Sequence, residues 1–255
     1  MPILFDVSYL FVRSLKKLIR NPILLFFSLL QPVIFLLLFT QLFSKFSQLP
    51  GFPASSYLQF AIAGILLQNA FSSALQSGTS MVDDLTTGNL QKMLVTPVSR
   101  SAILLGRITT DMFRVVVQSV IILVLALLLG ATVATGLPGV VLMIATIAFF
   151  GLAWSGISLA IGLRTKSAET VFGIGGFLTF PLLFISTALT PLSFMPTWMQ
   201  TVSKFNPISY TVDAVRVLML TGYTWNTILS AYAVVGAIGI VTIGLTLYQF
   251  RKVIS

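Results

Sequence analysis

Long stretches without a charged residue constrain this chain more than any other feature of its sequence. A transmembrane helix needs about 20 mainly apolar residues, and each of six stretches meets this requirement. They lie near residues 22–43, 57–80, 115–136, 139–162, 170–192 and 226–250. Charged residues make up only 8 % of the sequence, against about 25 % in soluble proteins, so a soluble enzyme is excluded. The sequence predicts an all-α membrane protein with six transmembrane helices.

The basic residues predict how these spans are oriented. Six spans place both termini on the same side of the membrane, and most of the 15 Lys and Arg residues would lie on that side. Because Lys and Arg gather in cytoplasmic loops, we expect both termini in the cytoplasm. In so apolar a chain, the net charge of +9 indicates contact with anionic lipid rather than with nucleic acid.

The third and fourth spans are expected to form an antiparallel hairpin, because only the segment Gly136 to Gly139 separates them. Small residues then recur along the fourth span at spacings of four, three and four. This pattern is typical of a face that packs closely against another helix. The residues are Gly151, Ser155, Ser158 and Gly162.

The segment 193–222 is partly apolar but carries charges that argue against a seventh span. Lys204, Asp213 and Arg216 would be buried in the bilayer, at a cost of about 2.5–3.5 kcal/mol each. We therefore expect two short helices that lie at the outer membrane interface or re-enter it. Asn206 followed by a proline is a favourable start for the second of them, and Asp213 and Arg216 would be neighbours on it.

Residues 3–20 have the pattern of an amphipathic helix. At 100° per residue, the charged side chains fall within about 100° of arc and apolar ones face away from them. The cations on the charged side are Arg13, Lys16, Lys17 and Arg20. We expect this helix to lie flat on the inner leaflet with its cations over anionic headgroups. The alternative is an ordinary basic segment beside the first span.

The loop 81–114 is the longest predicted cytoplasmic segment and contains a short apolar helix. Leu90, Met93 and Leu94 recur at helical spacing, and Pro97 ends the pattern. An apolar stripe outside the membrane requires a surface that covers it. That surface belongs either to a partner protein or to the chain's own bundle.

Two spans carry side chains suited to line a transport path. One side of the second span is polar, and polar groups at this depth face protein or a cavity rather than lipid. The fifth span carries glycines, a proline and phenylalanines that could grip an apolar cargo or close the path. The candidate path residues are Gln68, Ser72, Gln76, Phe177, Phe180 and Phe184. The alternatives are hydrogen bonds between helices for the polar set and core packing for the phenylalanines.

The sequence offers little for catalysis. It has no His and no Cys, which removes imidazole and thiolate chemistry and most zinc sites. It also has no G-x-x-x-x-G-K-[ST] phosphate-binding loop. We therefore expect a non-catalytic chain without metal or cofactor, and any ATP used for transport is bound by a partner. Because the six predicted spans contain no ionisable residue, an ion-coupled secondary transporter is disfavoured.

Two segments resemble the signatures of type-2 ABC transporter permeases, in particular of the daunorubicin-resistance branch. They are Gly88 to Arg100, GNLQKMLVTPVSR, and Pro191 to Arg216, PLSFMPTWMQTVSKFNPISYTVDAVR. The resemblance covers the whole chain and implies a single transmembrane domain over 1–255. Its parts would be a connecting helix at 1–21, spans one to five within 22–192, an extracytoplasmic re-entrant element at 193–222 and the last span at 226–250.

This resemblance also implies partners. It implies an exporter in a bacterial inner membrane, built from two copies of the permease, or from this chain and a similar permease, and from two separate subunits that bind ATP and Mg²⁺. The cargo would be a drug-like molecule or a lipid, or alternatively a lipid-linked glycan, and the second and fifth spans would meet at the dimer axis. The coupling helix that seats on the ATPase would comprise Gly88, Leu90, Gln91, Lys92, Met93, Leu94 and Pro97.

Overall fold

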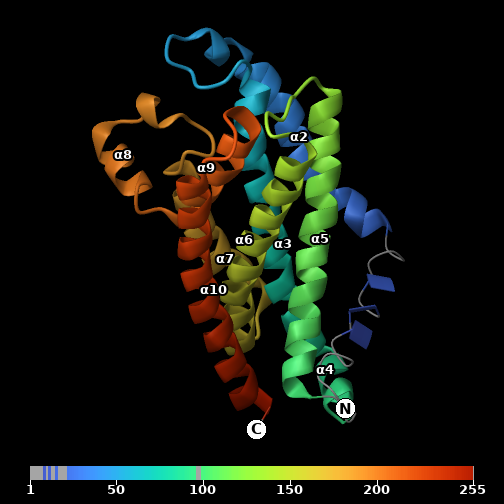
Figure 1. Ribbon diagram of the computed structural model, residues 1–255. Coiled ribbons are helices and arrows are strands. Elements are labelled where there is room, and N and C mark those ends of the chain that lie inside the picture. Colours follow the sequence, from blue (N-terminus) through green and yellow to red (C-terminus); the bar gives the residue numbers. More distant parts are fainter. Residues whose placement is uncertain (1–7, 10, 13–14, 17–21, 96–98, 255) are drawn as a thin grey trace.

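The structure, a computed structural model, describes residues 8–9, 11–12, 15–16, 22–95 and 99–254, and this part of the chain is helical without β-strands (Figure 1). The helices are α2 (Pro22–Leu42), α3 (Tyr57–Thr86), α4 (Asn89–Leu94), α5 (Arg100–Leu128), α6 (Gly136–Thr165), α7 (Ala168–Phe184), α8 (Thr197–Ser203), α9 (Pro207–Leu220) and α10 (Trp225–Ile254), with 3₁₀ turns at Ser44–Gln48 and Leu192–Phe194. The prediction of an all-α fold is confirmed.

Helices α3 and α6 form the centre of the bundle, with α5 on one side and α10 on the other (Figure 1). Between α3 and α6, a Cβ atom at Gly162 would lie 2.8 Å from the Gly78 carbonyl oxygen. The Ser158 hydroxyl donates to the Leu75 carbonyl at 3.2 Å. The predicted close-packing face of α6 is therefore confirmed at these positions. The main core follows the same two helices around the ring of Phe71.

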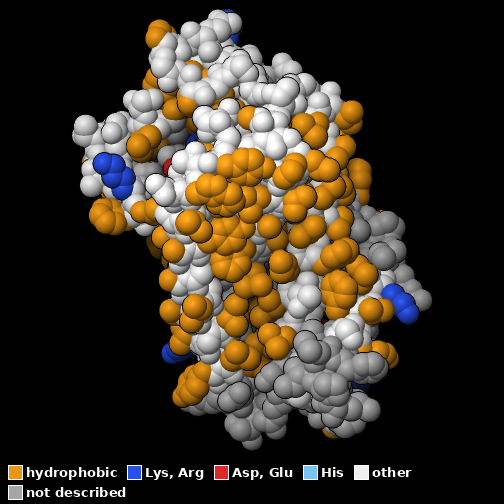
Figure 2. Space-filling model, in the orientation of Figure 1, with side chains coloured by type: hydrophobic (Ala, Val, Ile, Leu, Met, Phe, Trp, Pro, Cys, Tyr) orange, Lys and Arg blue, Asp and Glu red, His pale blue; other side chains and the backbone are white. Residues whose placement is uncertain are grey.

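Among the described residues, four helices are long and apolar enough to cross a membrane, namely Tyr57–Thr86, Ala102–Leu128, Gly136–Thr165 and Trp225–Phe250. Two shorter apolar helices, Phe26–Leu42 and Ala168–Phe184, lie where the first and fifth spans are predicted. Figure 2 shows hydrophobic side chains gathered over the middle of the bundle, as on a surface that meets lipid. The count of six spans stays a prediction, because it requires both shorter helices to cross.

The predicted hairpin turn at Gly136 to Gly139 is wrong. These residues form the first turn of α6, and the chain reverses over 129–135 instead. Pro138 fits inside α6 because the N–H groups of a first helical turn have no partner within the helix, so the N–H that proline lacks is not missed.

Helix α5 starts at Arg100, before the predicted start of the third span at residue 115. Charged residues that precede the predicted span therefore belong to the same helix. Arg107, Asp111 and Arg114 lie on this helix, and Asp111 is only 6 % exposed. The predicted span 115–136 contains no ionisable residue, but the helix that carries it does. The charges are paired, since Arg114 lies 3.6 Å from Asp111 and Arg107 lies 2.6 Å from Asp84, and pairing makes such groups tolerable near the bilayer.

Helix α7 ends at Phe184, before the predicted limit of 192, and the two expected short helices follow it. The second of them, α9, is capped as predicted. Asn206 Oδ1 accepts a hydrogen bond from the Ile208 N–H at 3.0 Å, and Pro207 occupies the first helical position. Helix α8 projects from the side of the bundle (Figure 1). The place of both helices at the outer interface stays a prediction.

Candidate functional site

Helix α3 is mostly buried, but a strip of polar side chains along its middle is partly exposed. Gln68, Ser72 and Gln76 are partly exposed, whereas Leu66 and Leu67 beside them are fully buried. The spacing of four places the three polar residues on one side of the helix, and we call them the polar stripe. Because polar groups at this depth avoid lipid, the stripe indicates a surface that meets another protein or borders a cavity.

The phenylalanines of α7 point away from the helix's own packing contacts. Gly175 faces α3 so closely that a Cβ atom there would overlap Leu75, which defines the inner side of α7. Phe177, Phe180 and Phe184 are 78 %, 58 % and 59 % exposed, and we call them the phenylalanine ridge. The alternative, that these phenylalanines pack into the core of their own chain, therefore does not hold. The structure also turns the ridge away from α3, so it does not bring ridge and stripe together within one chain.

Buried polar contacts join α3 to α5 next to the polar stripe. The Ser77 hydroxyl donates to the Asp111 carboxylate. At the stripe itself, Arg114 Nη1 donates to Gln76 Oε1 at 2.7 Å, so hydrogen bonding between helices holds for Gln76. These contacts were not predicted from the sequence. The available signal was the spacing of three between Asp111 and Arg114, which places both on one side of α5.

The short helix α4 packs its apolar side against its own bundle. Gly88 precedes it with a φ of 72°, a left-handed conformation that glycine adopts without steric cost. Leu90 is 2 % exposed in a cluster with Met81 and Leu104, and Met93 packs against the same cluster. The alternative of contact with the chain's own bundle therefore holds for Leu90 and Met93.

The exposed side of α4 carries different residues from the predicted stripe. Gln91 and Lys92 are exposed, and Val95, just after the helix, is 86 % exposed. The side chain of Leu94 and the whole of Pro97 lie outside the described residues. A protein that docks on this helix would thus meet Gln91, Lys92 and Val95.

The predicted amphipathic helix is described only in part. Its described residues are helical, and Lys16 is exposed. The ring of Phe11 lies 5.5 Å from that of Phe113, edge to face, so the apolar side of the segment contacts α5. The remaining predicted cations, Arg13, Lys17 and Arg20, lie outside the described residues.

A buried arginine fixes the opposite end of the bundle. Arg216 on α9 is 8 % exposed. Its guanidinium donates to the Thr187 carbonyl at 2.6 Å and pairs with the Asp213 carboxylate at 3.3 Å. The guanidinium carbon also lies 3.9 Å from the ring centre of Phe60. Burial lowers the pKa of Arg216 to about 10, so the group stays a cation at neutral pH. Burial also raises the pKa of Asp213. The sequence predicts the pairing of Asp213 with Arg216 but not the burial of Arg216 against α3 and the segment that follows α7.

These features define a multi-pass helical membrane protein with a polar strip that its own chain does not cover. Residues 6–220 match the family model of the ABC-2 type transporter. The chain belongs to the ABC-2 type transporter family, as a permease subunit, and the resemblance found in its sequence is confirmed.

Relatives agree with this assignment. The chain is 33 % identical over 209 residues to the daunorubicin resistance ABC transporter permease protein DrrB1 of Streptomyces coeruleorubidus, covering 81 % of this chain and 72 % of the relative. It is 35 % identical over 221 residues to a chain of Cyanophora paradoxa that carries the name transport permease ycf38, covering 84 % and 75 %. It is 23 % identical over 195 residues to the inner membrane transport permease YadH of Escherichia coli, covering 74 % of each chain.

Proposed function

We propose that this permease forms the membrane path of an exporter that moves a hydrophobic or amphipathic compound outwards, while separate subunits bind and hydrolyse ATP. The relative named for daunorubicin resistance supports a drug-like cargo. The relative named as an inner membrane permease supports a place in the inner membrane of a bacterium.

The observation that carries this proposal is the polar stripe of α3. Contact with lipid would leave the side-chain amide of Gln68, which has no partner among the described residues, without a hydrogen bond, at a cost of about 1–3 kcal/mol. The Ser72 hydroxyl already donates to the Gln68 carbonyl, and Gln76 accepts from Arg114. A second copy of the chain that set its own α3 opposite would enclose the stripe. The phenylalanine ridge would then supply apolar walls that suit an apolar cargo. The proposed path is thus lined by Gln68, Ser72, Gln76, Phe177, Phe180 and Phe184.

Two ATP-binding subunits, one for each permease copy, would dock at α4. The exposed residues Gln91, Lys92 and Val95 offer the contact surface, together with Leu94 and Pro97. Leu90 and Met93 instead anchor α4 to the bundle, so a push on α4 would reach α3 and α5 directly. The amphipathic segment 3–20 would lie beside it on the inner leaflet.

Helices α2 and α7 complete a set of six spans with both termini in the cytoplasm. Their 21 and 17 residues correspond to about 31 Å and 26 Å at a rise of 1.5 Å per residue, close to the hydrocarbon thickness of about 30 Å. Phe26 and Phe27 of α2 are 63 % and 62 % exposed, as expected for side chains that face lipid. Helices α8 and α9 then lie at the outer interface.

Proteoliposomes that contain the permease and its ATPase subunits test this function, with daunorubicin and a panel of amphipathic dyes as fluorescent cargoes. We expect ATP-dependent movement away from the ATPase side. Phe177→Ala should slow it, whereas Phe26→Ala, on another exposed phenylalanine, should not. The proposal fails if no compound moves with ATP, or if both variants slow transport equally.

A further inference from the structure

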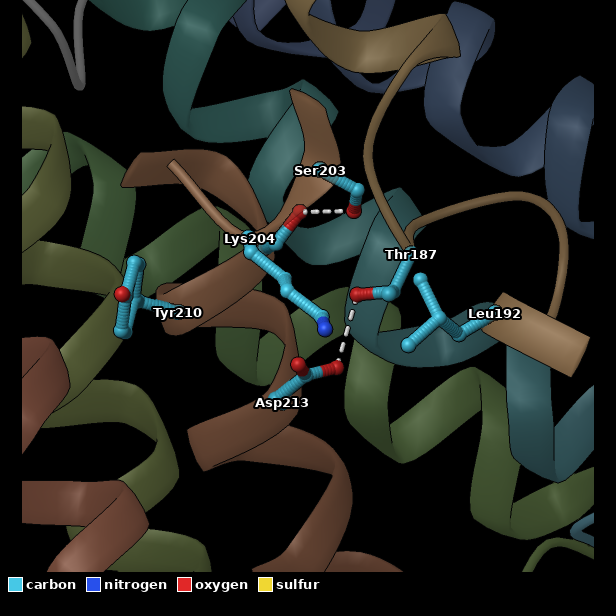
Figure 3. A pocket seen from close by; sticks show the side chains of 7 residues that line it. Thr187, Leu192, Ser203, Lys204, Tyr210 and Asp213 are labelled. Atoms are coloured by element: carbon cyan, nitrogen blue, oxygen red, sulfur yellow. Dashed lines mark hydrogen bonds between the residues drawn. The ribbon is translucent and has the colours of Figure 1, made fainter. Parts of the chain in front are cut away.

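A cavity of about 330 Å³ lies between the end of α7, helix α8 and helix α9 (Figure 3). Its walls include Thr187, Ser203, Lys204, Ser209, Tyr210 and Asp213. This volume is within the range of small-ligand sites, about 300–1,000 Å³. The cavity is separate from the polar stripe and the phenylalanine ridge, and neither set of path residues lines it.

Two charged side chains of opposite sign face this cavity without pairing with each other. Among the residues that the structure describes, the ion pair of Asp213 is with Arg216, and Lys204 takes part in none. Figure 3 shows the Lys204 amine directed into the space beside Thr187 and Asp213. The cavity thus offers one cationic and one anionic contact to the same ligand.

The carboxylate of Asp213 keeps one oxygen available. Oδ1 accepts the Thr187 hydroxyl at 2.7 Å and is also the atom that faces Arg216 at 3.3 Å. Within the described part of the chain, no hydrogen bond reaches Oδ2. A carboxylate has capacity for several donors, so Oδ2 can accept from an ammonium group that enters the cavity.

The cationic side of the cavity favours an acidic group such as phosphate. Lys204 lines the cavity, while Arg216 pairs with Asp213 from outside its lining, so the positive charge of Lys204 is left uncompensated. Ser203 and Ser209, whose hydroxyl oxygens are 2.8 Å apart, and Tyr210 also line the cavity. Lysine and hydroxyl donors together are well suited to phosphate oxygens.

The outer side of α8 is apolar, which connects the cavity to lipid. Trp198, Val202 and Phe205 are 60 %, 45 % and 82 % exposed, and their spacing of four and three places them on one side of this segment. Aromatic side chains of this kind gather at the membrane interface, at the level of the headgroups. An acyl chain could therefore lie along this side while its headgroup enters the cavity.

We propose that the cavity binds the headgroup of an amine-bearing phospholipid of the outer leaflet, with the phosphate at Lys204 and the ammonium at Asp213. This inference rests on the outer position of α8 and α9 in the proposed function. It does not depend on which compound is exported, because the lipid is held at the edge of the bundle and outside the path.

Native mass spectrometry of the purified permease, without ATPase subunits, tests this site with added phosphatidylethanolamine or phosphatidylglycerol. We expect phosphatidylethanolamine to bind more tightly. Lys204→Ala should weaken both lipids by about tenfold, the typical effect of losing a charge-assisted hydrogen bond. Lys45→Ala, at the other exposed lysine of the predicted outer face, should change neither. Asp213→Asn should weaken phosphatidylethanolamine alone.

The proposal is overturned if Lys204→Ala and Lys45→Ala behave alike, or if the two lipids bind equally to the unmodified chain. Soluble glycerophosphoethanolamine separates a lipid from a free phosphate ester. We expect it to displace the lipid only at concentrations at least a hundredfold higher, and equal potency would contradict the lipid assignment. Labelling of Thr201→Cys on α8 from outside the cell tests separately whether α8 and α9 lie at the outer face. A wrong topology is then distinguishable from a cavity that binds no lipid.

Discussion

Replacing Leu90 by Ala should destabilise the fold at the cytoplasmic end of the bundle. Leu90 is 2 % exposed among Met81, Leu104 and the other residues of its cluster. Truncation of a buried leucine costs about 2–5 kcal/mol, because the transfer free energy is lost and a cavity remains. Each kcal/mol lowers the melting temperature by about 2–4 °C in a domain of this size. Thermal unfolding of the purified permease in detergent should therefore show a clear drop.

Val95→Ala is the matched control for that substitution. Val95 is 86 % exposed, so its truncation should leave the melting temperature unchanged and weaken capture of the ATPase subunit instead. The same two preparations are compared by unfolding and by co-purification with the ATPase. If Leu90→Ala kept the full melting temperature and lost only ATPase binding, the assignment of Leu90 as an anchor within the bundle would be refuted.

Two further predictions concern packing elsewhere in the chain. Arg216→Ala should lower stability by about 1–3 kcal/mol in an unfolding experiment, because it removes the buried donor of the Thr187 carbonyl and the cation beside Asp213. Adding Asp213→Asn should restore part of the loss, and no restoration would contradict the second reason. Gly162→Leu should reduce the yield of monodisperse protein in gel filtration, because no side chain fits against the Gly78 carbonyl. Gly173→Leu should be tolerated, because a Cβ atom there meets nothing within 4 Å. Equal losses of yield in the two variants would argue against close packing at Gly162.

The sequence was sufficient for features that depend on local patterns. Apolar length predicted the helical membrane fold, the four-residue spacing predicted the polar stripe, and Asn206 before Pro207 predicted the start of α9. Each of these properties is set by the residues of one helix and its immediate flanks. Family membership was likewise predictable from two short motifs, and the family match over 6–220 confirms it.

The features that the sequence did not predict depend on contacts between helices. The start of α5 was placed too late because charged residues were assumed to end a span, whereas Asp111 is paired with Arg114 and accepts from Ser77 on α3. The sequence predicted that α4 has an apolar side, but only the tertiary structure shows that the chain's own bundle covers Leu90 on that side. The burial of Arg216 over the ring of Phe60 also depends on a contact between two helices, α9 and α3.

Disulfide cross-linking between two copies tests most directly the claim that the polar stripe lines a path at the dimer axis. The chain has no cysteine, so single cysteine variants can be compared in membranes without further changes. We compare Ser72→Cys on α3 with Val241→Cys on α10, where the Val241 side chain is 60 % exposed. We expect Ser72→Cys to form cross-linked dimers readily and to lose transport when oxidised, while Val241→Cys does neither. Cross-linking that is equally fast at both positions, or that occurs at Val241 alone, would contradict a path between the two α3 helices.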